Sequence, residues 1–239
     1  MSQQDISTTR EGPLQHIRLT RPSKRNAVTM SMFRTFASML RDAETDSSVR
    51  AIVLSGEGSD FCAGHDLEAF DSWPQNPGDP VPEFLHVLAA LTKPLVIAAH
   101  GHAVGIGATL MLHADWSLCT SEAQLRLPFA DLDIGPEAGS SLLLGHAIGS
   151  LRAKFLLLSG QAFSGKQAFD WGMVAELAPL ERLLDRARHM ATQLAERAAL
   201  VAQLKRWQVP ESCIRERIDA EVRYINTRIV KRRPSEAGL

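Results

Sequence analysis

The sequence predicts an α/β protein with an N-terminal core of strands and helices and a helical C-terminal part. Three short apolar runs, at 51–56, 95–99 and 116–119, favour buried strands. Apolar residues at helical spacing lie between these runs, an alternation typical of helices that cover a sheet. From residue 138 onward, helical patterns follow one another almost without interruption.

The first strand is expected over residues 14–20, where Ile17 and Leu19 alternate with Arg18 after a turn at 11–13. A polar loop follows at 21–27. A helix then starts near Thr29, a residue type that suits an N-cap. Its apolar residues fall at helical spacing: Met32, Phe33, Phe36, Met39, Leu40 and Ala43.

The middle of the chain combines loops, helices and the second and third apolar runs. Residues 71–82 hold four prolines and little apolar material, which predicts a loop. A helix over 83–92 then leads to the strand at 95–99. Glycines 101, 105 and 107 precede a helix that runs through residues 110–112, before the strand at 116–119.

The C-terminal part is expected to form helices over 150–159, 165–171, 181–205 and 211–230, the second of them ended by Gly172. No fixed-period repeat and no clear linker divide the chain. We therefore expect residues 1–180 to form the core and residues 181–239 to form a helical region that packs on it and does not fold alone.

Composition narrows the class of protein. The chain has 239 residues and a formal net charge of -1, from 26 basic and 27 acidic residues, which argues against a nucleic-acid binder. No stretch is apolar and long enough for a membrane helix, and the first residues lack the apolar core of a signal peptide. The three cysteines share no CxxC spacing and are expected to be reduced thiols. A cytoplasmic protein is the expectation.

Three loop segments combine residues that carry chemistry. Residues 61–67 (FCAGHDL) and 101–110 (GHAVGIGATL) place glycines next to predicted helix starts, where backbone N–H groups are free to meet a ligand. The alternative for both is structural: a plain strand-to-helix turn for the first, and close packing of small residues for the second. Neither segment has the GxGxxG spacing of a dinucleotide-binding loop.

The third segment, 132–141 (LDIGPEAGSS), contains Glu137. Pro136 suits the first turn of a helix, and an acid beside it complements the helix dipole, which explains Glu137 without a function. The other interpretation is a carboxylate in an apolar pocket of small residues, where burial makes it a stronger base.

Taken together, these segments resemble the crotonase superfamily, the enoyl-CoA hydratase/isomerase family. The resemblance runs from about Gly12 to the end of the chain. It includes the loop 21–27 (RPSKRNA), the segments 61–67 and 101–110, and 164–174 (SGKQAFDWGMV). It implies a crotonase-like spiral of ββα units, with a C-terminal helical region that forms trimers.

The resemblance also implies an oxyanion hole made of two backbone N–H groups. By position these belong to His65 and Ile106, and together they would hold the enolate oxygen of an acyl-CoA thioester. The family usually has small residues at these places. His65 departs from that pattern, so its side chain is expected to shape the selectivity for the acyl group.

The family's hydratases hold a water with two glutamates, whose positions fall here on Thr109 and Phe129. Neither residue can act as a carboxylate base. Glu137 remains, and 127–141 looks like the Δ3,Δ2-enoyl-CoA isomerase branch, which places its catalytic glutamate there. The resemblance therefore implies a shift of a 3-enoyl-CoA double bond to 2-enoyl-CoA, with Glu137 as the single base.

The remaining site residues follow from the same resemblance. Lys24 and Arg25 lie where the family's loop wraps the nucleotide of CoA, and the other residues expected to contact the CoA ester are Ala27, Ala63, Asp66, Leu67 and Phe129. A basic group near the end of the chain is a further candidate for the CoA phosphates: Arg228, Lys231, Arg232 and Arg233. A solvated helix end explains these four residues equally well.

Several alternatives stay open. Asp131 and Asp133 are weaker candidates for the base, and three histidines (His100, His102 and His113) do not have the spacing of a metal site. We expect no metal and no separate cofactor, because coenzyme A is part of the substrate. A homotrimer or hexamer is the family habit. The competing functions are a hydratase, another crotonase reaction such as thioester hydrolysis, and a CoA-ester binder without activity.

Overall fold

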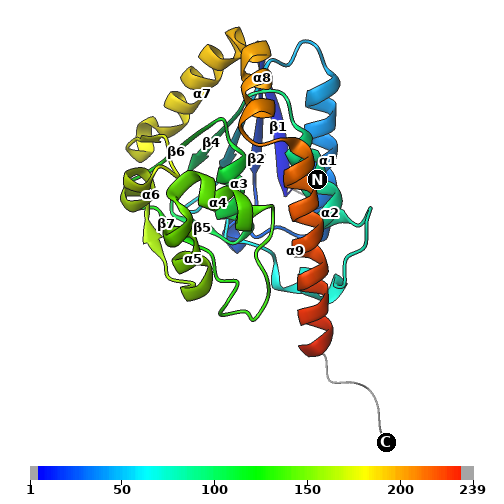
Figure 1. Ribbon diagram of the computed structural model, residues 1–239. Helices are drawn as coiled ribbons and strands as arrows, with labels where there is room; N and C mark the ends of the chain where they lie inside the picture. Colours follow the sequence, from blue (N-terminus) through cyan, green and yellow to red (C-terminus); the bar gives the residue numbers. More distant parts are fainter. Residues whose placement is uncertain (1–4, 233–239) are drawn as a thin grey trace, which may run out of the picture.

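The computed structural model describes residues 5–232, and six strands of this range form its central sheet (Figure 1). Along the sheet they follow the order β1 (Ile6–Glu11), β2 (Leu14–Leu19), β3 (Ala51–Gly56), β4 (Leu95–Ala99), β6 (Trp116–Cys119) and β9 (Glu176–Leu177). The β1–β2 hairpin is antiparallel, and every later neighbour is parallel. A second sheet joins β5 (His102–Val104), β7 (Gln124–Arg126) and β8 (Phe163–Ser164).

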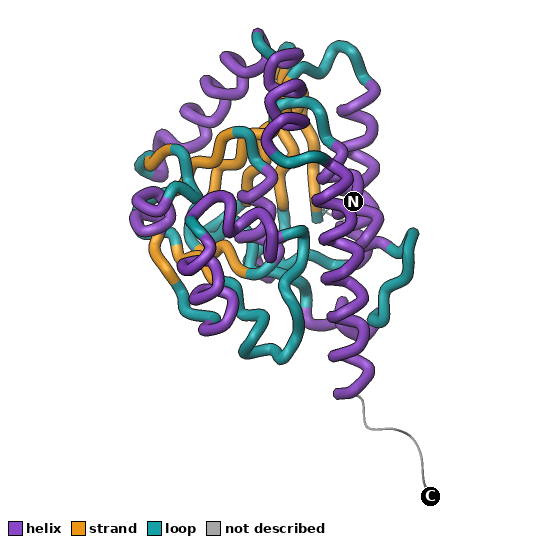
Figure 2. Tube along the Cα trace, in the orientation of Figure 1, coloured by secondary structure: helices purple, strands orange, loops and turns teal. Residues whose placement is uncertain are grey.

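Both faces of the central sheet are covered, which explains why its inner strands are continuous apolar runs. Successive side chains of β3 alternate between two clusters: Ile52 and Leu54 belong to the larger core, while Ala51 and Val53 face the smaller one. Helix α1 (Met30–Thr45) packs on the first side and α7 (Leu180–Glu196) on the second, and Figure 2 shows the strands between these helices.

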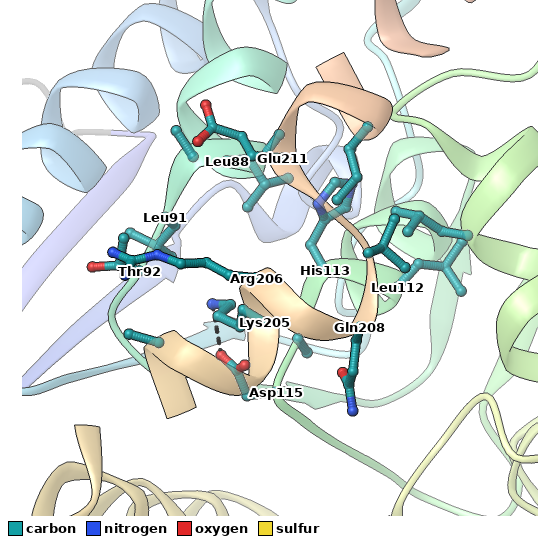
Figure 3. A pocket seen from close by; sticks show the side chains of 17 residues that line it. Leu88, Leu91, Thr92, Leu112, His113, Asp115, Lys205, Arg206, Gln208 and Glu211 are labelled. Atoms are coloured by element: carbon teal, nitrogen blue, oxygen red, sulfur yellow. Dashed lines mark hydrogen bonds and ion pairs between the residues drawn. The ribbon is translucent and has the colours of Figure 1, made fainter. Parts of the chain in front are cut away.

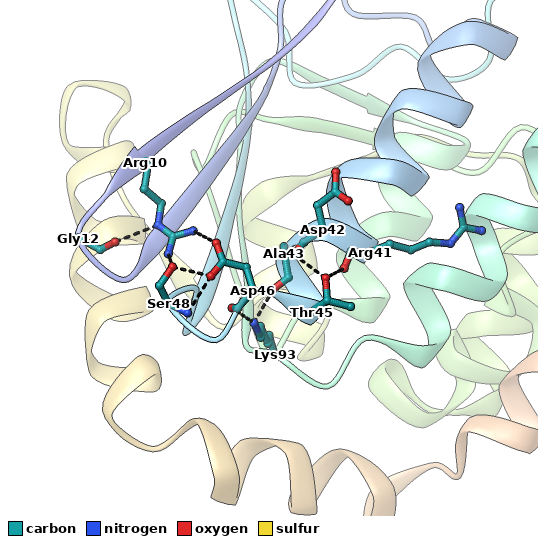
Figure 4. Close-up of polar contacts among 9 residues, drawn as sticks. All are labelled: Arg10, Gly12, Arg41, Asp42, Ala43, Thr45, Asp46, Ser48 and Lys93. Atoms are coloured by element: carbon teal, nitrogen blue, oxygen red, sulfur yellow. Dashed lines mark hydrogen bonds and ion pairs between the residues drawn. The ribbon is translucent and has the colours of Figure 1, made fainter.

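The sequence of α1 explains both of its ends. At the start, Thr29 Oγ1 accepts a hydrogen bond from the Met32 N–H at 3.2 Å, as its N-cap role predicts. At the end, Lys93 donates to the backbone oxygens of Ala43 and Asp46 (Figure 4). The last turn of α1 has no basic residue of its own, so the Lys93 ammonium supplies the positive charge that suits a helix C-terminus.

The remaining helices surround the two sheets. Their bounds are η1 (Pro22–Lys24), η2 (Leu67–Ser72), α2 (Pro80–Ala90), α3 (Ile106–Leu110), η3 (Met111–His113), α4 (Ser140–Ile148), α5 (Ser150–Ser159), α6 (Gly165–Trp171), α8 (Ala198–Gln208) and α9 (Glu211–Arg232). Helix α9 returns across the molecule to lie against α2 and α4 (Figure 1), and it buries Ile218, Val222, Ile225 and Ile229 in the larger core.

Three helix predictions are wrong in their bounds. Helix α2 starts at Pro80, three residues before the predicted 83, because proline fits the first turn of a helix. The single helix expected over 181–205 is two helices, α7 and α8, which part at Arg197. The helix expected at Pro136 starts later: Gly139 adopts a left-handed conformation (φ 70°), and α4 begins at Ser140.

No helix in the described range, residues 5–232, is long and apolar enough to cross a membrane.

Candidate active site

An apolar cavity of about 140 Å³ lies where three loops meet helix α9. Of the residues that line it, two carry ionisable side chains, His65 and Glu137. The others are small, aliphatic or aromatic: Ala63, Gly64, Leu67, Phe70, Trp73, Val104, Gly105, Pro128, Phe129, Leu132, Ile134, Gly135 and Ile225. A carboxylate in such surroundings can act on a substrate from which most water is excluded.

The first loop, 61–67, runs beside β5 and presents the His65 backbone. Cys62 forms a parallel bridge with Ala103, through Cys62 N–H to His102 O at 3.0 Å and Val104 N–H to Cys62 O at 2.9 Å. Gly64 then turns the chain at φ 103°, where a β-carbon would lie 3.1 Å from Val104 O. Across the described residues, the His65 N–H that follows has no acceptor.

The second loop leads from β5 into α3 and presents the Ile106 backbone. Gly105 has φ 53° and ψ -118°, a conformation that suits glycine alone, and its own N–H donates to Arg126 O at 2.9 Å. Ile106 is the first residue of α3, so its N–H has no partner inside the helix and finds none elsewhere among residues 5–232. A β-carbon on Gly105 would lie 4.0 Å from Gly64 Cα, so the two loops are adjacent.

The third loop places Glu137 between these two. The Glu137 side chain is 7% exposed, and its Oε2 lies 2.7 Å from His65 Nε2. Its Oε1 would be 3.6 Å from a β-carbon on Gly105. Glu137 and His65 therefore line one cavity, although 72 positions separate them, and Ile106 directly follows Gly105, which lines it as well.

Two side chains, the partly buried His113 and the buried Glu221, hold the turn that carries Glu137. His113 Nε2 donates to Ala138 O at 2.7 Å, and burial lowers the pKa of His113 to about 4, so the ring is neutral. From the other side, the Glu221 carboxylate of α9 accepts the Gly139 N–H at 2.7 Å and the Ser141 N–H at 2.9 Å. The residues after Glu137 are thus fixed by two separate elements.

The sequence predicts a role in acyl selectivity for the His65 side chain, but not its contact with Glu137. Its family position pointed to the backbone N–H, but its ring also forms a hydrogen bond with Glu137. Phe33 and Phe70 lie against the ring, at centroid distances of 4.9 and 5.6 Å. The available signal was a histidine where the family has a small residue, in a chain that also carries Glu137.

The residues expected to contact the CoA ester fall into two groups. Ala63, Leu67 and Phe129 line the cavity, whereas Lys24, Arg25, Ala27 and Asp66 do not. Lys24, Arg25 and Ala27 lie on the loop beside the cavity, because Arg25 O accepts the Ala63 N–H at 2.9 Å.

Asp66 has a structural partner. Its Oδ2 lies 2.5 Å from Arg21 Nη1, and this hydrogen bond lowers the pKa of Asp66. Its Oδ1 accepts the Glu68 N–H at the start of η2, at 3.1 Å. The Asp66 carboxylate therefore ties the loop that contains Arg21 to the segment that presents His65.

No second carboxylate lines the cavity among the described residues. Thr109 is fully buried, and its Oγ1 donates to Ile106 O at 3.3 Å. Asp131 forms an ion pair with Arg126 at 2.6 Å, and Asp133 forms one with Arg228. Arg228 is therefore already paired at the end of α9, and Arg233 lies outside the described residues.

His100 and His102 each have a hydrogen-bond partner away from Glu137. His100 Nε2 is 2.9 Å from Gly58 O, and His102 Nδ1 is 2.5 Å from Asp60 Oδ1. Neither lines the cavity that holds Glu137.

A second cavity, of about 170 Å³, lies between the end of α2, η3, α8 and the start of α9 (Figure 3). In the figure, Lys205 and Asp115 point toward each other, and their charged atoms are 2.8 Å apart. His113 lines this cavity while donating to Ala138, so the space lies behind the Glu137 turn. Lys205, Asp115 and Glu211 of this cavity are held in ion pairs, and Glu137 does not line it, which makes the Glu137 cavity the candidate active site.

Comparisons with known proteins identify relatives over most of the chain. The sequence model of the enoyl-CoA hydratase/isomerase family matches residues 9–236. The 1,2-epoxyphenylacetyl-CoA isomerase of Escherichia coli strain K12 is 35% identical, over 77% of this chain and 75% of its own. The carnitinyl-CoA dehydratase of Salmonella agona strain SL483 is 30% identical, over 97% and 90%.

Solved structures agree over almost the whole chain. Pseudomonas aeruginosa OdaA is 34% identical, with a TM-score of 0.88, over 98% of this chain and 96% of its own. An enoyl-CoA hydratase/isomerase from Pseudoalteromonas atlantica T6c is 27% identical, with a TM-score of 0.89, over 95% and 92%. The curated relatives carry the names of different reactions on CoA thioesters, an isomerisation and a dehydration, so similarity alone does not choose the chemistry.

Proposed function

This chain belongs to the enoyl-CoA hydratase/isomerase family, and we propose that it moves a double bond in an acyl-CoA thioester through one base, Glu137. Its fold is the mixed α/β, crotonase-like fold with a C-terminal helical region, as the resemblance predicts. The family is firm, whereas the 3-enoyl-CoA isomerase reaction is our proposal.

One observation carries the proposal: a single carboxylate lines an apolar cavity together with His65, whose backbone N–H is unpaired, and the unpaired N–H of Ile106 directly follows Gly105 in the cavity wall. Such donors stabilise negative charge that develops on a thioester oxygen, by about 3 kcal/mol each. A base that both removes and returns a proton needs no second acid and no positioned water. The residues present suit that chemistry.

The reaction is then a proton shift in two steps. Glu137 takes the C2 proton of a 3-enoyl-CoA, and the electrons of that C–H bond delocalise through the diene onto the thioester oxygen. The N–H groups of His65 and Ile106 bind this oxygen. When the electrons return, the C2–C3 double bond forms, and the Glu137 carboxyl group gives its proton to C4. Glu137 is again an ionised carboxylate at the end of the reaction.

The cavity favours this shift over hydration. Phe129 forms part of the wall where the family's hydratases hold an acid, and Thr109 lies outside the cavity. Activation of a water requires a polar group that positions it, and the Phe129 side chain on this wall is a hydrocarbon. The competing hydratase therefore lacks its usual residues.

The size of the cavity supports a short or ring-sized acyl group. Its volume of about 140 Å³ is close to that of the engineered apolar cavity of about 150 Å³ that binds benzene. Phe70, Trp73 and Phe129 supply aromatic surface, and Ile225 of α9 contributes to the wall. A relative is named for an epoxyphenylacetyl thioester, which carries a ring of this size.

Two features outside the cavity belong to the same proposal. Lys24 and Arg25 are exposed on the loop next to Ala63, where they would meet the phosphates of CoA. Helix α5 exposes an apolar stripe, with Leu151, Phe155 and Leu158 at 82%, 54% and 77% exposure. Such a face suits contact with further copies of the chain, in the homotrimer or hexamer that the resemblance implies. Light scattering on the purified protein measures that state.

The deciding experiment compares the wild-type protein with Glu137→Gln on 3-hexenoyl-CoA. We expect kcat for 2-enoyl-CoA formation to fall by about 10³-fold or more, with binding of the CoA ester nearly unchanged, because the amide keeps the shape but cannot take a proton. Full activity of Glu137→Gln would rule the mechanism out.

Incubation of wild-type protein with 2-hexenoyl-CoA tests the alternatives. A 3-hydroxyacyl product would identify a hydratase, and release of the free CoA thiol would identify a hydrolase. Tight binding of both esters without any product would identify a CoA-ester binder.

A further inference from the structure

We infer that the imidazole of His65 is a positioning residue for Glu137: it holds one carboxylate oxygen and leaves the other to carry the proton. The backbone N–H of the same residue is the proposed oxyanion donor, so His65 serves both halves of the site. Because this role rests on the proposed function, its test includes a measurement that does not depend on turnover.

The geometry of the pair is that of a strong, fixed hydrogen bond. His65 Nε2 and Glu137 Oε2 are 2.7 Å apart, and the two side chains are 6% and 7% exposed. Water competes little for either group at this depth, and hydrogen bonds to an ionised group are stronger than neutral ones. Phe33 and Phe70 lie against the ring and restrict its rotation.

The surroundings of the ring indicate where its proton lies. Nδ1 of His65 is buried and has no hydrogen-bond partner among the described residues. A doubly protonated ring would therefore bury an N–H without an acceptor, which is costly. If a protonated Glu137 instead donated to Nε2, the proton of the neutral ring would lie on Nδ1. The N–H there would again lack an acceptor. We therefore assign the single ring proton to Nε2, which donates it to an ionised Glu137.

The two oxygens of Glu137 are then unequal. Oε2 is occupied by His65, while Oε1 lies on the side of Gly105, whose absent side chain leaves space beside it. Gly105 directly precedes Ile106, the second oxyanion donor. Oε1 is thus the oxygen nearer to the bound thioester. It takes the proton from C2 and returns it to C4, so the transfer stays on one face of the acyl chain.

Two substitutions separate this role from simple packing. His65→Gln keeps a side-chain N–H donor near the place of Nε2, whereas His65→Leu keeps bulk and removes the donor. Both retain the backbone N–H of residue 65. On 3-hexenoyl-CoA we expect His65→Leu to lower kcat by about 10²-fold with KM changed less than about threefold, and His65→Gln to stay within about tenfold of wild type.

A matched control is available in a second histidine–carboxylate pair. His86 Nε2 lies 2.8 Å from Asp219 Oδ1, and neither residue lines the cavity. His86→Leu makes the same chemical change outside the site and should leave kcat within about twofold of wild type. A loss there equal to that of His65→Leu would overturn the positioning role, because the loss would then come from the fold.

Infrared spectroscopy supplies the measurement that does not need turnover. The band of protonated Glu137 is identified by difference from Glu137→Gln at neutral pH. We expect it to be absent from wild type and from His65→Gln, and present in His65→Leu.

The outcomes separate the two proposals. Wild-type protein that neither isomerises 3-hexenoyl-CoA nor exchanges its C2 protons with D2O would refute the proposed function, while the infrared result would still test the pair. An active wild type with His65→Leu equally active would refute the role of His65 alone. If His65→Leu does not fold, a protonated Glu137 in the wild-type spectrum would refute that role by itself.

Discussion

The carboxylate of Glu221, on the last helix, accepts the backbone N–H of Gly139 at 2.7 Å, two residues after the proposed catalytic base. It also accepts the Ser141 N–H at 2.9 Å, so it binds free donors at the start of α4. Burial raises the pKa of Glu221 above its usual range, and these N–H groups offset part of the rise. Helix α9 therefore fixes the turn that carries Glu137.

Replacing Glu221 with glutamine should disturb catalysis without touching the cavity. An amide can accept one of the two N–H groups through its oxygen, but it presents a donor to the other. We expect kcat to fall by about tenfold at nearly constant KM, and the free energy of unfolding to fall by about 1–3 kcal/mol. Steady-state kinetics and urea denaturation measure both effects. Glu216→Gln, on the exposed side of the same helix, is the control. Equal kcat values in the two variants would contradict the coupling.

Gly64 tests the oxyanion hole through backbone geometry. A β-carbon there would lie 3.1 Å from Val104 O at φ 103°, so Gly64→Ala must displace the His65 N–H. We expect about a 10²-fold loss of kcat, the usual cost of losing one oxyanion donor. Gly78 also has a positive φ, 90°, but nothing lies within 4 Å of an added β-carbon. Gly78→Ala should therefore keep its activity, and a comparable loss in that variant would count against the assignment.

Ile225 should limit the length of the acyl group. Ile225→Ala removes carbon from the cavity wall, whereas Ile229→Ala removes the same atoms one turn further along α9, outside the cavity. Each substitution should cost about 2–5 kcal/mol of stability, because both residues are buried. Only Ile225→Ala is expected to raise kcat/KM for octenoyl-CoA relative to butenoyl-CoA, by about tenfold. An identical chain-length profile in both variants would show that α9 does not limit the acyl group.

His113 makes stability depend on pH in a known direction. Burial lowers the pKa of His113 to about 4, whereas the unfolded residue titrates near 6.5. Between these values the unfolded chain binds a proton that the folded protein does not. The free energy of unfolding therefore falls as pH drops from about 6.5 to about 4, by on the order of 3 kcal/mol for this group.

Urea denaturation across that pH range measures the effect. His113→Gln should fall less steeply with acid, because glutamine can still donate to Ala138 O but does not titrate. His16, whose pKa burial also lowers to about 4, leaves some slope in the variant. His146→Gln, at an exposed position, should follow wild type. A slope in His113→Gln as steep as in wild type would disprove this source of acid sensitivity.

The parts of the fold that local sequence encodes were predictable. Strands β3, β4 and β6 are apolar because both of their faces are buried, and these runs mark their positions. Strand β1 was missed because it is an edge strand with mostly exposed, polar residues. Strands β8 and β9, of two residues each, are too short to create a period. At Arg197 neither glycine nor proline marks the break between α7 and α8.

The candidate site was predictable in its loops but not in its side-chain contacts. Glu137 and the backbone of His65 and Ile106 follow from motifs, and the structure places Glu137 and His65 in one cavity, with Ile106 next to Gly105 of its wall. The hydrogen bond from His65 to Glu137 joins residues 72 positions apart, and no local pattern encodes such a pair. Glu221 was also missed, because an acid beside the apolar face of a helix gives no sign that the fold buries it.

Because α9 is the last helix of the described range, the parts of the cavity are synthesised in a fixed order. A ribosome makes the loops around Glu137 well before it reaches Glu221 and Ile225, the residues of α9 that brace the turn and contribute to the cavity wall. Until α9 is made, the Gly139 and Ser141 N–H groups lack the Glu221 carboxylate, and the cavity lacks Ile225. In the proposed mechanism, the support of Glu137 is therefore one of the last parts of the site to form.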